Sequence, residues 1–258
     1  MNNQGFDYIK LVMRDEFLAL KELFIERKIF LIVIISILIS IVVFLKPFPP
    51  LTVTLTTVNN SDYAYARFAE YLRDGLEKKG IKANLIVTAG SVENANLLES
   101  PKSDVNIALI QGGALSNEQS QKFYSLGSVM YEPVWIFCRK DLAKVPQELK
   151  DLARLNLTVG LGPAGGGTLP LVRRLFAVNE IDITNRSNFR VSSYESDVDD
   201  LLNSKLDCAI EVMPYFDKKV QSLLRNPKIS LIDAPDAKAY QMSLSYIEDL
   251  VIPAHSID

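Results

Sequence analysis

The sequence predicts an α/β fold of two lobes, preceded by one N-terminal transmembrane helix. Two observations lead to this prediction: an uncharged apolar run extends from Ile29 to Leu45, and strand patterns alternate with helix patterns from Leu51 onward. Strands separated by helices indicate βαβ units with parallel strands. The chain has 258 residues, 48% of them hydrophobic and 23% charged, so it carries enough apolar surface for packed cores.

The apolar run predicts a membrane anchor over residues 29–46. Only Ser36 and Ser40 interrupt it, and a helix over these residues is about 26 Å long, close to the thickness of the bilayer hydrocarbon. The residues after it, Lys46 to Pro50, contain no small-residue cleavage site, so we expect an uncleaved signal anchor rather than a removed signal peptide. A buried core helix is the alternative, and the lysines at both ends of the run weaken it.

The flanking charges predict the orientation of this anchor. Basic residues are more frequent before the run than directly after it, which places the N-terminus in the cytoplasm and the rest of the chain outside. We therefore expect a single-pass protein of the cytoplasmic (inner) membrane whose part after residue 50 lies in the periplasm or outside. Residues 1–28 are expected to form a cytoplasmic amphipathic segment, and residues 47–50 a proline-rich linker.

The exported part reads as strands and helices in alternation. The first lobe is expected over residues 51–137, the second over 138–230, and residues 231–258 are expected to return toward the first lobe in a shortened form. The expected strands are 51–58, 82–88, 105–110, 129–139, 155–160, 188–191 and 207–212, and the expected helices are 62–79, 92–99, 146–151, 169–178 and 194–203.

Composition limits the chemistry that the chain can perform. A net charge of -3 gives no electrostatic basis for nucleic-acid binding. The chain has two cysteines and one histidine, His255, which is too little material for a zinc site or a nucleophile–histidine pair. We therefore expect no catalytic residues, no metal and no cofactor. Cys138 and Cys208 lie in apolar, strand-like runs, and we expect buried free thiols, with a disulfide as the alternative.

Three loops between an expected strand and an expected helix are candidates for ligand binding. They are Thr88 to Ser91, Gln111 to Gly113, and Gly162 to Thr168. In α/β lobes, ligands bind beyond the carboxyl ends of the strands, where helix N-termini favour anions. Ser91 with Asn94, and Thr168, are expected to cap the helices that follow. The loop from Gly162 to Thr168, called the glycine loop below, lacks the Gly-Lys-Ser/Thr and Gly-x-Gly-x-x-Gly patterns of nucleotide-binding loops. The expected anion is therefore a carboxylate, and the alternative is a tight turn that binds no ligand.

Several motifs in order resemble the TAXI family of solute-binding receptors, which serve tripartite ATP-independent periplasmic (TRAP) transporters. The similarity extends from about Leu51 to Ala209. The motifs that carry it are Thr88 to Asn94, Asp104 to Gly113, Tyr131 to Phe137, Leu157 to Gly160, Gly165 to Thr168, Tyr194 to Leu202 and Lys205 to Ala209.

The resemblance implies a two-lobed periplasmic-binding-protein (type II-like) fold that closes on a small carboxylate, an amino acid or organic acid. The implied partners are the membrane permease subunits of a TRAP transporter, in addition to the lipid bilayer around residues 29–46. The implied ligand contacts are Asn59, Tyr63, Tyr65, Ser91, Val92, Glu93, Asn94, Gln111, Gly112, Glu132, Trp135, Gly165, Gly166, Gly167 and Thr168.

Two other functions remain open from the sequence. The first loop, from Thr57 to Tyr65, departs from the glycine-rich loop of the family, which suggests an interaction or scaffold protein without a ligand. An enzyme on the same fold is the third hypothesis. Its acid–base candidates are Glu93, Glu132, Asp199 and Asp207, but we expect the acidic run from Asp197 to Asp200 to be a solvated helix face.

Overall fold

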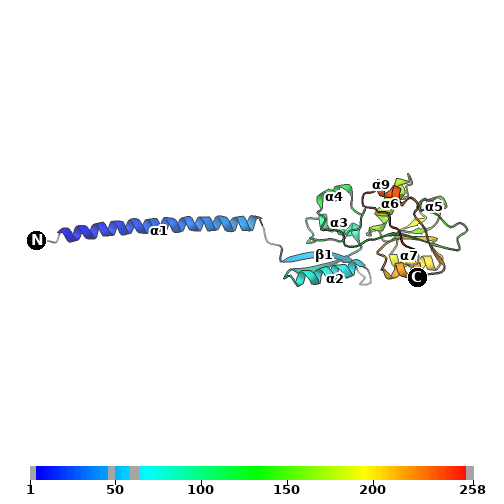
Figure 1. Cartoon of the computed structure of the whole chain (residues 1–258), viewed down its shortest axis with the longest axis horizontal. Helices are drawn as coiled ribbons and strands as arrows, with labels where there is room; N and C mark the ends of the chain where they lie inside the picture. The colour runs from blue at the N-terminus through cyan, green and yellow to red at the C-terminus, as the bar shows by residue number, and fades with distance from the viewer. Residues whose placement is uncertain (1–3, 46–49, 59–63, 254–258) are drawn as a thin grey trace. The chain divides into compact units, whose positions relative to one another are not determined.

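The computed structural model describes residues 4–45, 50–58 and 64–253. The chain consists of two compact units, one up to Pro50 and one from Leu51 onward. Figure 1 colours both by residue number.

The N-terminal unit is one continuous helix, α1 (Gln4–Leu45). Its segment Arg27–Leu45 has a mean hydropathy of 3.1 and no buried residue, so it is long and apolar enough to cross a membrane. The amphipathic segment expected before it is helical and continues into the same helix.

The second unit begins with a two-stranded lobe. Strands β1 (Thr52–Val58) and β2 (Lys82–Thr88) pair in parallel along their whole length. The helices of this lobe are α2 (Ala64–Glu77), α3 (Ser91–Glu99) and α4 (Asn117–Lys122). Instead of the strand expected at 105–110, Ile107 makes a single parallel bridge with Leu55. The hydrophobic cluster around these strands is small, with Val53, Leu55 and Ala83 as its buried members.

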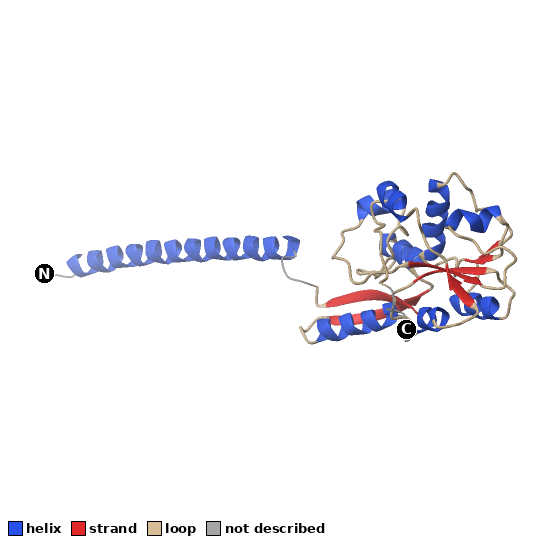
Figure 2. Ribbon diagram, turned by 45° about the vertical axis from the view of Figure 1, so that its right-hand side comes forward, coloured by secondary structure: helices blue, strands red, loops and turns tan. Residues whose placement is uncertain are grey.

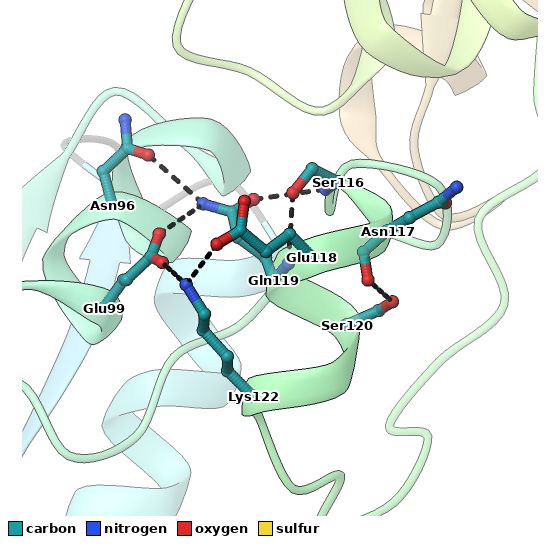
Figure 3. Close-up of polar contacts among 8 residues, drawn as sticks. All are labelled: Asn96, Glu99, Ser116, Asn117, Glu118, Gln119, Ser120 and Lys122. Atoms are coloured by element: carbon teal, nitrogen blue, oxygen red, sulfur yellow. Dashed lines mark hydrogen bonds and ion pairs between the residues drawn. The ribbon is translucent and has the colours of Figure 1, made fainter.

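Helix α4 was not expected from the sequence, and a polar network holds it to α3. Ser116 and Gln119 form a capping box at its start. The Lys122 ammonium lies 2.7 Å from a carboxylate oxygen of Glu99 on α3 and 2.7 Å from one of Glu118 (Figure 3). These contacts are exposed to solvent, so they position α4 without forming a core.

The five-stranded lobe contains the remaining elements. Its sheet has the order β5-β4-β6-β3-β7. The strands are β3 (Val134–Arg139), β4 (Val159–Gly160), β5 (Phe189–Arg190), β6 (Cys208–Val212) and β7 (Ile229–Leu231), and the helices are α5 (Leu149–Arg154), α6 (Thr168–Val178), α7 (Tyr194–Leu202), α8 (Lys218–Leu224) and α9 (Ala237–Ser243). The prediction of parallel strands is correct for β4, β5 and β6 and wrong for β3, which runs antiparallel to both β6 and β7.

Helices cover both faces of this sheet (Figure 2). Side chains of a strand alternate between the faces, and β3 shows the result. Ile136 and Cys138 join one buried cluster with residues of α5 and α6, whereas Trp135 and Phe137 join the opposite cluster with residues of α7 and α8. The uninterrupted apolar run of β3 is therefore explained by burial on both faces.

The expectation of free thiols is wrong, because Cys138 and Cys208 form a disulfide. The two residues face each other directly in the antiparallel β3–β6 pair, with their Cα atoms 4.1 Å apart. Residues 70 positions apart in the sequence become neighbours only through this pairing, which the sequence does not reveal.

The predicted α/β class is confirmed: the chain is a mixed α/β protein whose strands form a two-stranded and a five-stranded sheet, and it carries an N-terminal apolar helix. The lobe boundary expected between residues 137 and 138 falls inside β3.

Candidate functional site

Two glycine-containing loops, one from each lobe, meet at the start of α3 and α6. Gly90 directly precedes α3 and has a φ of 133°, a region that side chains rarely adopt. A Cβ atom at Gly90 would lie 3.0 Å from the Cα of Gly166, and one at Gly165 would lie 2.7 Å from the Cβ of Ala89. Glycine is therefore required where the loops approach each other.

A backbone hydrogen bond joins the two lobes at this point. The N–H of Val92, in the first turn of α3, donates to the carbonyl oxygen of Gly165 at 3.0 Å. The first N–H groups of a helix have no partner within the helix and carry the positive end of its dipole. The Gly165 oxygen thus occupies a position in which a negatively charged hydrogen-bond acceptor would be stabilised.

The two expected helix caps are wrong in detail. Gly90 and Gly167 are the N-cap residues of α3 and α6, and neither helix has a side-chain cap. Ser91 instead accepts a hydrogen bond from the N–H of Gln111 at 3.0 Å, and the Thr168 hydroxyl lies 3.0 Å from that of Tyr194. Both hydroxyl groups thus contact other segments, the Gln111 loop and the start of α7, rather than capping their own helices.

Gln111 extends from the two-stranded lobe to the five-stranded lobe. Its Nε2 donates to the carbonyl oxygen of Val212, at the end of β6, at 2.7 Å. Its Oε1 is buried and lies against Gly167, where an added Cβ would be 2.0 Å away. Gly167 therefore leaves the space that this glutamine side chain fills.

Tyr65 and Glu132 form a further contact next to this group. The Tyr65 hydroxyl, on α2, donates to Glu132 Oε2 at 2.6 Å. Burial raises the pKa of Glu132 to about 7, although hydrogen bonds from Tyr65 and Gln111 oppose the rise. The same burial, together with the charge of Glu132, raises the pKa of Tyr65 well above its usual value. Glu132 therefore holds a proton to a higher pH than an ordinary carboxyl group does.

Three residues that the sequence did not select also belong to this region: Tyr194, Asp197 and Glu211. The Tyr194 ring packs against Gly162 and Gly166. Asp197 accepts a hydrogen bond from the N–H of Gly162 at 2.7 Å and another from Ser192. The expectation that residues 197–200 form a solvated face is therefore wrong for Asp197, which is fully buried, with its pKa raised by that burial.

The other expected contact residues have different surroundings. Asn94 is buried, accepts from Thr88 and donates to the carbonyl of Leu109, so it joins elements of its own lobe. Glu93 is exposed and accepts from the N–H of Ala89. Trp135 lies in a core cluster and donates to the carbonyl of Met213, and an added Cβ at Gly112 would contact Tyr246. Asn59 and Tyr63 lie outside the described residues.

Two open surface hollows lie away from this region. Their volumes are about 490 and 560 Å³, and neither is lined by an expected contact residue. Within the part of the chain that the structure describes, no group of three or more Asp, Glu, His or Cys side chains is arranged to hold a metal ion. The meeting of the loops between the lobes is therefore the candidate site.

Comparison with models of protein families identifies the family of the chain. The model of the NMT1-like family matches residues 57–257, which includes both lobes and the loops described above. The chain belongs to the NMT1-like family. No curated protein matches this NMT1-like protein.

Solved structures with similar chains are ligand-binding proteins. One is the AvGluR1 ligand-binding domain in complex with glutamate, at 14% identity and a TM-score of 0.47, with 71% of this chain and 77% of that chain covered. Another is the arginine-bound form of truncated ArgBP from T. maritima, at 13% identity and a TM-score of 0.45, with 70% and 81% covered. A third is an ancestral cationic amino acid solute-binding protein, at 15% identity and a TM-score of 0.42, with 71% and 77% covered.

Proposed function

We propose that this NMT1-like protein is a membrane-anchored receptor that captures a small carboxylate between its lobes and delivers it to a TRAP-type transporter. The observation that carries the proposal is the hydrogen bond from Val92 to Gly165, which joins the N-terminus of α3 to the glycine loop before α6. A ligand carboxylate takes the place of the Gly165 oxygen when the lobes open, and the α3 dipole stabilises its charge.

The receptor is proposed to be anchored by the apolar segment of α1, with the two lobes outside the cytoplasmic membrane. Tethering keeps the binding domain at a high effective concentration near membrane permease subunits. The disulfide between Cys138 and Cys208 supports this location, since disulfides persist in oxidising compartments.

Thermal unfolding of the full chain, purified in detergent, tests the binding function. The compounds are amino acids, dicarboxylates and keto acids. A ligand at one hundred times its dissociation constant adds about 2.7 kcal/mol to the free energy of unfolding, which raises the Tm by roughly 5–10 °C.

The variant Gly166→Val should abolish that shift. A Cβ at Gly166 would lie 2.8 Å from the Tyr194 hydroxyl and 3.1 Å from the Pro163 carbonyl oxygen, so the loop must move. Gly75→Ala is the matched control, because nothing lies within 4 Å of an added Cβ on that exposed face of α2. The control should retain the full shift.

One observation favours a second candidate, a scaffold without a ligand. The donors between the lobes are already paired with protein groups, among them Val92 with Gly165 and Gln111 with Val212. If a cooperatively folding chain shows no shift with any compound, the receptor proposal is rejected and the scaffold is retained.

A further inference from the structure

Acceptor atoms without hydrogen-bond partners gather where the lobes meet. Among the described residues, both carboxyl oxygens of Glu211 and the Oε1 atom of Gln111 are buried and have no hydrogen-bond partner. Buried polar atoms are nearly always paired, because an unpaired one loses its hydration without compensation. These three oxygen atoms therefore call for a donor.

Glu211 is placed in this position by its strand. It lies in β6, opposite Trp135 of β3, and only 1% of its surface is exposed. The next residue, Val212, accepts the Gln111 side chain through its carbonyl. Glu211 and Gln111, from different lobes, thus converge on the end of one strand.

Tyr194 links these acceptors to Glu132. Burial raises the pKa of the Tyr194 phenol, and the nearby charges of Glu211, Glu132 and Asp197 raise it further. The carboxyl groups of Glu211, Glu132 and Asp197 therefore all lie near the Tyr194 phenol. Aromatic rings in such a place also attract cations.

The charges that face Glu211 come from several elements. Burial, followed by the charge of Asp197, raises the pKa of Glu211 well above its usual value, and Asp217 and Glu195 act in the same direction. Lys219 opposes the rise, but its ammonium lies 2.9 Å from Glu195. The balance at Glu211 therefore favours the approach of a further positive charge.

We propose that Glu132, Glu211 and the Oε1 atom of Gln111 form a subsite for a protonated amine of the ligand. The inference rests on the proposed receptor function and narrows its substrate class to compounds with a cationic nitrogen. Gln111 comes from the two-stranded lobe, so lobe opening withdraws its side chain from β6 and exposes both carboxyl groups. A dicarboxylate without an amine meets repulsion at the same place.

Matched pairs of compounds test the subsite with the full chain in detergent. Each amino acid is compared with the keto acid of the same carbon skeleton, and linear diamines are included, in thermal unfolding and calorimetric titration. We expect the amine-bearing member of a pair to bind at least about tenfold more tightly. Equal affinity for the keto acid overturns the subsite and leaves the receptor function in place. No binding by any compound overturns the receptor function and the subsite together.

Two isosteric variants locate the subsite. Glu211→Gln and Glu132→Gln should each weaken amine binding at least about tenfold and leave keto-acid binding unchanged. Asp199→Asn is the control, because it removes one negative charge from an exposed position of α7. Unchanged amine affinity in both Glu variants contradicts the assignment.

Proton release gives an independent reading of the same subsite. Since the pKa of Glu132 is about 7, an amine that binds beside it must displace its proton at neutral pH. Calorimetry in buffers of different ionisation enthalpy should show proton release on amine binding, and less of it in Glu132→Gln, in which Glu211, whose pKa is also raised, can still release a proton. Absence of proton release in the wild-type chain contradicts a role for Glu132.

Discussion

The two lobes differ in how their cores are built. The five-stranded lobe has buried clusters on both faces of its sheet and a disulfide through its centre. The two-stranded lobe has three buried residues in its cluster, and hydrogen bonds join it to the other lobe, among them Val92 with Gly165, Gln111 with Val212 and Tyr65 with Glu132. We infer that the larger lobe is the rigid platform and that the smaller one docks on it through hydrogen bonds.

The disulfide gives the largest expected effect on the platform. The double variant Cys138→Ser, Cys208→Ser removes a link between residues 70 positions apart, which should lower the free energy of unfolding by about 4 kcal/mol. Denaturant unfolding of the full chain measures the change. The wild-type chain under reducing conditions should unfold at the same midpoint as the variant; a variant as stable as the oxidised chain contradicts the prediction.

The Tyr65–Glu132 contact should make lobe docking sensitive to pH. The pKa of Glu132 is raised from 4.5 to about 7, so the folded state holds a proton that the unfolded state has lost between these values. Stability should therefore fall by roughly 3 kcal/mol as pH rises from about 4.5 to 7, and then stay level. Denaturant unfolding at several pH values in this range measures the decrease in the free energy of unfolding. In Glu132→Gln, the part of the decrease that comes from Glu132 should be missing. An equal decrease in both chains refutes the assignment.

Glycine substitutions separate the interface from the rest of the smaller lobe. Gly167→Ala places a Cβ where Gln111 Oε1 lies, so Gln111 must leave Val212, and we expect a loss of about 1–3 kcal/mol. Gly75→Ala, at an open position in the last turn of α2, should instead stabilise the chain by about 0.5–1 kcal/mol. Thermal unfolding measures both variants. If Gly167→Ala also raised the Tm, the packing of Gln111 against Gly167 would not require a glycine.

The exposed network on α4 should give the smallest effect. Lys122→Met breaks the ion pairs with Glu99 and Glu118 shown in Figure 3. Because both contacts are exposed to solvent and screened by salt, we expect no measurable change in the Tm. A clear drop would mean that α4 contributes to lobe docking.

Local patterns predicted most helices and strands, since their signals lie within one segment. The apolar run of α1, the alternation in β1 and the glycine before α6 are examples. The patterns failed for short elements fixed by tertiary packing. Strand β7 has three residues, and residues 105–110 make one bridge rather than a strand, because neighbouring segments decide such pairings.

The candidate site was predicted in part, loop by loop. Ser91 and the glycines from Gly165 to Gly167 do converge, because they lie at the starts of α3 and α6. Gln111 and Glu132 join them, Gln111 by reaching the end of β6 and Glu132 by preceding the antiparallel strand β3. Tyr194, Asp197 and Glu211 were missed. The one available signal for Glu211 was an acidic residue inside the apolar strand Cys208–Val212.

The sequence by itself determined the apolar N-terminal helix, the α/β class and the glycine loops, because hydrophobic periodicity and glycine conformation act over a few neighbouring residues. Only the tertiary structure decided that Cys138 lies opposite Cys208, that β3 runs antiparallel to β6, and that Gln111 of one lobe lies at the end of β6 in the other. These contacts join residues far apart in the chain, and strand pairing and lobe docking bring them together. The burial that results from this packing raises the pKa values of Glu132 and Glu211.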